Sequence, residues 1–131
     1  MSAIKKAEQD TSGEIRVHIE NKCPLESPVA RAIFIFDAIG MFDTAQRNGV
    51  LIYVSLKSRK FAIIGDVGIN NVVKQGFWNG VKDSLATYFE KGEIAEGIKY
   101  AVLETGKLLK DYFPHKEDDK NEQPDEISYG R

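Results

Sequence analysis

The sequence has few of the features that mark specialised classes of protein. Its 131 residues contain a single cysteine, Cys23, so no internal disulfide can form, which fits a reducing compartment. No apolar run approaches the roughly 18 residues that a membrane span needs. The first residues do not resemble a signal peptide. We therefore expect a protein with no membrane span in this chain and a cytoplasmic location.

An excess of charge of one sign is also lacking. The chain has 18 Lys and Arg residues against 20 Asp and Glu residues, a formal net charge of −2. A nucleic-acid-binding domain of this size is usually basic, so we expect no nucleic-acid partner. The charged fraction of 29% and the apolar fraction of 42% are ordinary for one globular domain with a real core.

Signatures of common catalytic and metal sites are missing as well. The sequence contains no G-x-S-x-G, no phosphate-binding P-loop and no G-x-G-x-x-G. His18 and His115 have no cysteine or histidine at the spacing of a zinc site. Cys23 lies in a proline-containing loop without an evident base, so an unreactive thiol is the simpler interpretation.

The clearest structural pattern covers residues 47–69. Val50 to Val54 is an unbroken apolar run, typical of a strand buried on both faces. A second apolar run, residues 61–64, follows a polar break that is too short for a crossover, so the two runs predict a β-hairpin. The second strand ends at Gly65-Asp66, which places a carboxylate in a flexible turn.

The remaining segments supply one more strand and several helices. Alternation over Glu14–Glu20 predicts a strand with one buried face. Helical spacing predicts helices over residues 29–39, over residues 70–89 with a break near Gly76, and from residue 93 to Pro114. Residues 2–9 resemble the end of a helix, and a truncated N-terminal helix is one interpretation.

These elements predict one domain over residues 1–114, followed by a polar, acidic tail over residues 115–131 that is mobile or draped over the domain. An apolar central strand needs cover on both faces, so the expected class is α/β. The architecture is a three-layer α/β/α sandwich around a small mixed β-sheet. The first two strands should be parallel, joined by a right-handed crossover, and the hairpin makes the third antiparallel.

This topology also predicts a site. It brings Glu14, the loop with Asp43 and the strand end with Asp66 to one edge of the sheet, and the first long helix carries Asp37 towards it. Several carboxylates on loops suit a hard cation such as Ca²⁺ or Mg²⁺. Other interpretations stay open: Glu14, Asp37 and Asp43 as solvated charges, and Asp66 as a helix cap or turn residue.

Three segments form a set that is more specific together than singly: residues 11–17 (TSGEIRV), 47–53 (RNGVLIY) and 61–69 (FAIIGDVGI). They resemble the TPM domain, a family that includes a thylakoid lumen acid phosphatase, a photosystem II repair protein and an auxiliary protein of a nematode acetylcholine receptor. The end of the chain, residues 119–130, looks like the ending of a soluble bacterial branch. The resemblance implies an α/β/α sandwich and a divalent-cation site near the Gly-Asp turn, which carries over most directly to Asp66.

Three hypotheses for function follow. The first is a cation-binding module that acts by binding or regulating an unknown protein partner, because the sequence offers acidic loops but no positioned nucleophile. The alternative is a metal-dependent acid phosphatase that hydrolyses phosphomonoesters, in which the cation polarises a phosphoryl oxygen. Arg47 or Arg16 would then contact the phosphate or a partner. The third is a structural domain whose acidic residues bind nothing specific.

Overall fold

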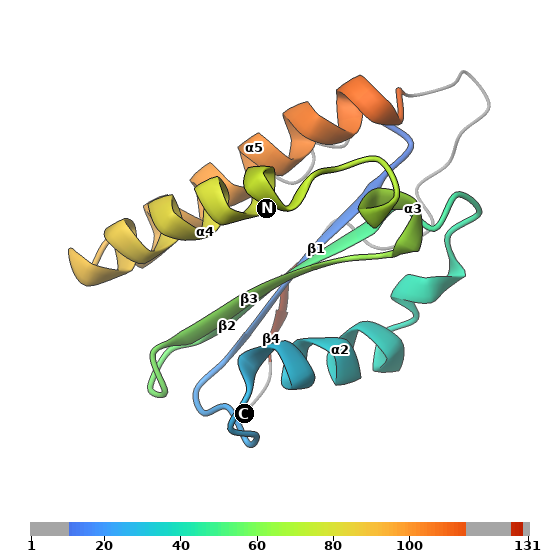
Figure 1. The fold of residues 1–131 in the computed structure, drawn as a ribbon. Coiled ribbons are helices and arrows are strands. Elements are labelled where there is room, and N and C mark those ends of the chain that lie inside the picture. Colours follow the sequence, from blue (N-terminus) through green and yellow to red (C-terminus); the bar gives the residue numbers. More distant parts are fainter. Residues whose placement is uncertain (1–10, 115–126, 130–131) are drawn as a thin grey trace.

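The structure is a computed structural model that describes residues 11–114 and 127–129 (Figure 1). In chain order its elements are β1 (Glu14–Glu20), α2 (Pro28–Ala38), the short 3-10 helix η1 (Met41–Asp43), β2 (Gly49–Ser55), β3 (Lys60–Gly65), α3 (Val67–Asn70), α4 (Gln75–Glu90), α5 (Ile94–Tyr112) and β4 (Ile127–Tyr129).

The strands form one mixed sheet in the order β3-β2-β1-β4. As predicted, β1 and β2 are parallel and β2 and β3 form an antiparallel hairpin. The tail differs from its prediction at one point, because residues 127–129 pair in parallel with residues 17–19 of β1 and add an edge strand. The rest of the predicted tail and the predicted helix over residues 2–9 lie outside the described residues.

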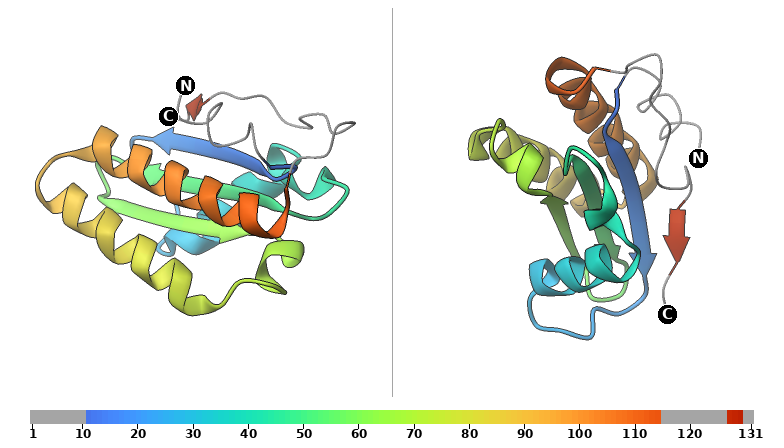
Figure 2. Two further views of the ribbon diagram at one scale, coloured as in Figure 1. Left: turned by 90° about the horizontal axis from the view of Figure 1, so that it is seen from above. Right: turned by 90° about the vertical axis from the view of Figure 1, so that its right-hand side faces the viewer.

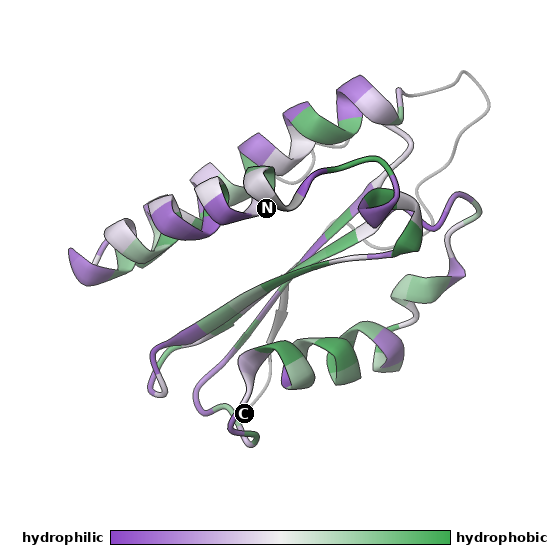
Figure 3. Ribbon diagram, viewed as in Figure 1, coloured by the Kyte–Doolittle hydropathy of each residue, from purple (hydrophilic) through white to green (hydrophobic). Residues whose placement is uncertain are grey.

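Helices cover both faces of the sheet, which confirms the three-layer arrangement. α4 and α5 lie on one face and α2 on the other (Figures 1 and 2). Side chains of β2 alternate between two cores: Ile52 packs under α4 and α5, whereas Leu51 and Tyr53 pack under α2. Every residue of β2 is buried, as its unbroken apolar run predicted. Figure 3 shows that α2 is apolar along most of its length.

The helix ends follow local chemistry, with one difference from the prediction. α2 begins at Pro28, where the Ser27 hydroxyl accepts a hydrogen bond from the Ala30 N–H (3.1 Å). The helix predicted over residues 70–89 is two helices, α3 and α4. The break falls before Gly76, in residues 71–74, where Val73 turns into the core.

No helix in the described part of the chain is long and apolar enough to cross a membrane. The cytoplasmic location stays a prediction.

Candidate functional site

Three segments that are distant in the sequence meet around Gly49 at one edge of the sheet. Glu14 is the register partner of Gly49 across β1 and β2. The Asp66 N–H donates to the Gly49 carbonyl (3.0 Å). A Cβ atom on Gly49 would lie 3.2 Å from the Met41 carbonyl oxygen, a tight contact that shows how closely this loop approaches the strand. We call this region, residues 11–14, 41–49 and 65–68, the Asp66 edge.

The Asp66 carboxylate holds the centre of this edge. Its two oxygens accept hydrogen bonds from Arg47 Nε (2.6 Å) and Arg47 Nη2 (2.8 Å). Its Oδ1 also accepts from the Val67 N–H (2.7 Å), which caps the N-terminus of α3. The side chain of Asp66 is only 1% exposed, whereas that of Arg47 is 43% exposed. Asp66 is therefore a buried anion neutralised by a cation that faces solvent.

Arg47 is held in place by its backbone and by an aromatic ring. Its φ of 51° is in the left-handed region, which is uncommon for a residue other than glycine. The Arg47 carbonyl accepts from the Gly68 N–H (2.9 Å), and the guanidinium carbon lies 5.2 Å from the centre of the Phe42 ring. The hydrogen bonds to Asp66 raise the pKa of Arg47 above its ordinary value, so the guanidinium stays charged.

A set of uncharged polar side chains ties the loops of the Asp66 edge together. Ser12 Oγ accepts from Gln46 Nε2 (2.9 Å) and from Asn48 Nδ2 (3.3 Å). The Asn48 N–H donates to Thr44 Oγ1 (3.1 Å), and Asn48 is buried. Asn48 was not among the site residues predicted from the sequence. Its position inside the RNG segment that carries the family resemblance was the available signal.

The predicted carboxylates take different positions. Glu14 is buried at the start of β1, while Asp43 on η1 and Asp37 on α2 are exposed. Among the described residues, no group of three or more His, Cys, Asp or Glu side chains is placed to hold a metal ion. The four carboxylates therefore do not form a ready-made ligand set, although three of their segments meet. Cation binding itself stays a prediction.

The other predicted contact residue, Arg16, lies in β1 opposite Leu51 of β2 and is partly buried. It is two residues along the strand from Glu14, so it belongs to the sheet and not to the loops of the Asp66 edge.

A second charged cluster lies at the opposite end of β1. It was not predicted from the sequence. Glu20 is 2% exposed and accepts hydrogen bonds from Arg31 Nε and Nη2 (both 2.9 Å). The Tyr53 hydroxyl also donates to Glu20, and His18 Nε2 lies 3.7 Å from Glu20 Oε1. The strand was predicted to have one buried face, yet both faces are buried here. A tyrosine inside an apolar strand was the available signal, since a buried hydroxyl needs a partner.

The ionisation of this cluster follows from its burial and its hydrogen bonds. Burial lowers the pKa of His18, against the opposing effect of Glu20, so the imidazole is neutral. Burial alone would raise the pKa of Glu20, but hydrogen bonds from Arg31 and Tyr53 outweigh it and the net shift is downward. Burial raises the pKa of Tyr53 far above its ordinary value. Hydrogen bonds thus join Glu20, Arg31 and Tyr53, whereas both ring nitrogens of His18 are buried with no hydrogen-bond partner among the described residues.

Comparisons with known proteins agree with the fold. The NMR structure of the BA42 protein from the psychrophilic bacterium Bizionia argentinensis matches with a TM-score of 0.90 and 40% identity, over 98% of this chain and 88% of that one. The N-terminal domain of a protein from P. gingivalis matches with a TM-score of 0.67 and 18% identity, over 88% of this chain and 76% of that one, and shares the fold. No curated protein matches the sequence. The family model of the TPM domain matches residues 1–108, and the chain therefore belongs to the TPM domain family.

Proposed function

We propose that this domain is a binding module that responds to a divalent cation, Ca²⁺ or Mg²⁺, at the Asp66 edge. One observation supports this more than any other: the Asp66 carboxylate is buried, and the guanidinium that neutralises it is partly exposed to solvent. A nearby cation offsets the cost of burying a carboxylate. Because Arg47 reaches Asp66 from the solvent side, a small cation has access to the same carboxylate if the side chain of Arg47 moves.

The surrounding oxygen atoms are of the chemical types that bind a hard cation, although they are not arranged as a preformed set of ligands. The Asp66 edge offers carboxylate, hydroxyl and amide oxygens on loops, together with the exposed carboxylate of Asp43. Ca²⁺ and Mg²⁺ prefer such oxygen ligands. Without a preformed set of three ligands, binding requires the loops to rearrange. A bound cation would supply positive charge and order to these loops, which is what a regulated binding surface needs.

The test is a titration of the full chain with Ca²⁺ and with Mg²⁺, followed by NMR for each backbone amide. We expect saturable shifts in residues 43–49 and 65–68, weakened in Asp66→Asn and in Asp43→Asn. Asp83→Asn is the matched control, because Asp83 is an exposed carboxylate on α4, away from this edge. It removes the same charge and should leave the affinity for the cation unchanged.

Two results would overturn the proposal. One is a set of shifts spread over the acidic residues after Pro114 with none at the Asp66 edge, which is ordinary counterion binding. The other is an equal loss of affinity in Asp66→Asn and Asp83→Asn, which shows that only the net charge matters.

The phosphatase alternative needs an arginine that is able to contact a phosphate. Arg16 lies within the sheet, and Arg47 is free for a phosphate only when a cation has displaced it from Asp66. Neither arginine is placed for a phosphate beforehand, so we favour the binding module. Hydrolysis of an aryl phosphate, assayed at acidic and neutral pH with Ca²⁺ or Mg²⁺, separates the two functions. Turnover that disappears in Asp66→Asn, with Asp83→Asn active, would favour the phosphatase.

A further inference from the structure

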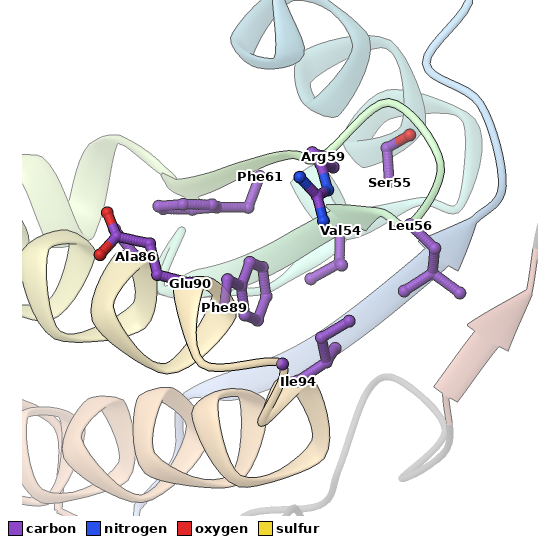
Figure 4. A pocket seen from close by; sticks show the side chains of 10 residues that line it. Val54, Ser55, Leu56, Arg59, Phe61, Ala86, Phe89, Glu90 and Ile94 are labelled. Atoms are coloured by element: carbon purple, nitrogen blue, oxygen red, sulfur yellow. The ribbon is translucent and has the colours of Figure 1, made fainter.

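A cavity of about 420 Å³ lies at the other end of the molecule from the Asp66 edge, between the β2–β3 hairpin and the turn that joins α4 to α5 (Figure 4). We propose that this cavity binds a small amphipathic carboxylate, a molecule with an apolar chain or ring and one anionic end. The cavity shares no residue with the Asp66 edge, so this proposal and the cation proposal can be tested independently.

The floor of the cavity is apolar and is built from four elements. Val54 of β2, Phe61 of β3, Phe89 of α4 and Ile94 of α5 all line it. The rings of Phe61 and Phe89 meet edge to face with centroids 5.4 Å apart, which gives the floor a defined shape. Both the volume and the largely apolar lining are those of cavities that bind small molecules, which hold roughly 300–1,000 Å³.

The positive charge of Arg59 indicates that the ligand is an anion. In Figure 4 its guanidinium reaches over the cavity from the hairpin side, and Glu90 lines the cavity from the opposite side, on α4. Arg59 is exposed, and in the part of the chain that the structure describes its guanidinium forms no ion pair. A guanidinium presents paired N–H donors that match the two oxygens of a carboxylate. An anionic end at Arg59 and an apolar body over Phe61 therefore fit together.

The backbone of Arg59 supplies an independent observation. Its φ of 54° is left-handed, in a hairpin turn where glycine or asparagine is the usual residue. The other arginine with positive φ, Arg47, is explained by its pairing with Asp66 and by the Gly68 hydrogen bond. Within residues 11–114 and 127–129, no such contact accounts for an arginine at position 59. Residues kept in uncommon backbone conformations concentrate at ligand sites, and here the unexplained one faces a cavity.

The experiment is an NMR titration of the full chain with octanoate and, in parallel, with 1-octanol, which has the same chain length and no charge. We expect saturable shifts in the residues that line the cavity, with octanoate at least about tenfold tighter than octanol, as a charge-assisted hydrogen-bond pair predicts. Arg59→Gly should abolish this difference, and Arg59→Lys should keep part of it.

Two controls separate loss of binding from loss of folding or of charge. Arg59→Gly removes the side chain and also relieves the left-handed backbone, so a thermal melt should show a fold at least as stable as the wild type. Lys57→Gln removes one positive charge from the same turn at a residue that does not line the cavity. The absence of saturable shifts, equal binding of octanol and octanoate, or an equal effect of Lys57→Gln and Arg59→Gly would each overturn the proposal.

Discussion

At each end of the sheet an arginine binds a buried carboxylate through two nitrogens, but the surroundings of the two pairs differ. Glu20 is 1% exposed in its side chain and its partner Arg31 is 23% exposed, and Tyr53 adds a third donor. Asp66 is equally buried, but its partner Arg47 is 43% exposed. One carboxylate is enclosed by a helix and a strand, whereas the other lies at the base of solvent-facing loops.

The difference teaches how one chemical pair serves two purposes. Where the arginine is also mostly buried, as Arg31 is, each partner depends more on the other, and the pair acts as part of the core beneath α2. Where the arginine faces water, as Arg47 does, water can solvate its charge when the ion pair is broken. The pair therefore contributes less to stability, and another cation can replace the arginine more easily. This contrast is why we place a site at Asp66 and not at Glu20.

The largest expected effect comes from removing the enclosed carboxylate. Glu20→Ala leaves Arg31 and the Tyr53 hydroxyl without their acceptor, and should lower the free energy of unfolding by about 3 kcal/mol. Asp66→Ala should cost about 1 kcal/mol, mostly for the lost cap of α3. Urea denaturation measures both. Equal losses in the two variants would show that enclosure does not distinguish the pairs.

The next effect tests how tightly the loops of the Asp66 edge are packed. A Cβ on Gly68 would lie 2.2 Å from the Gln46 carbonyl oxygen and 2.6 Å from that of Arg47, so the backbone must move. Gly68→Ala should cost about 2 kcal/mol, as other overpacked sites do. Gly80→Ala on α4 is the control, because a Cβ there meets nothing within 4 Å. That variant should be neutral or stabilising in the same urea experiment, since alanine favours a helix.

A smaller effect appears as a pH dependence of the enclosed cluster. Burial lowers the pKa of His18 below its ordinary 6.5. As the pH falls below about 6.5, this histidine therefore takes up a proton in the unfolded chain before it does so in the folded protein, and the free energy of unfolding decreases. The lowered pKa of Glu20 adds a second loss below 4.5. His18→Gln should remove the first loss between about pH 7.5 and 5 in thermal melts. His115→Gln changes the only other histidine and should leave the loss intact.

The smallest effect compares the two arginines with left-handed backbones. Arg59→Gly should stabilise the protein by roughly 0.5 kcal/mol, the relief of the left-handed conformation less the greater flexibility of glycine in the unfolded chain. Arg47→Gly gains the same relief but loses the pair with Asp66, so it should show no net stabilisation. Differential scanning calorimetry of both variants measures this. A stabilised Arg47→Gly would mean that the pair with Asp66 contributes nothing to the fold.

Much of the architecture could be predicted because it depends on local pattern. The apolar run of β2, the short polar break before β3 and the alternation in β1 define strands and a hairpin without reference to distant residues. Helical spacing located α2 and α5 within a residue or two. Topology then brought residues 14, 43–48 and 66 to one edge of the sheet.

The partners of the charged side chains could not be predicted in this way. Whether Asp66 faces other carboxylates or Arg47 depends on the left-handed turn at Arg47 and on the close contact of Gly68 with the neighbouring loop. The Glu20 cluster depends on how α2 docks, because only that packing brings Arg31 to the strand. The position of residues 127–129 beside β1 likewise depends on pairing with a strand more than 100 residues earlier.

The sequence by itself therefore determined which segments become strands and helices, and the order in which they alternate, because these follow from short-range periodicity. Only the tertiary structure decided which carboxylate is enclosed, which faces solvent through its partner, and where an arginine overhangs an apolar cavity. Those outcomes depend on burial and on distances between residues far apart in the chain. The same Asp, Glu and Arg residues carry different free energies in water and in a packed interior.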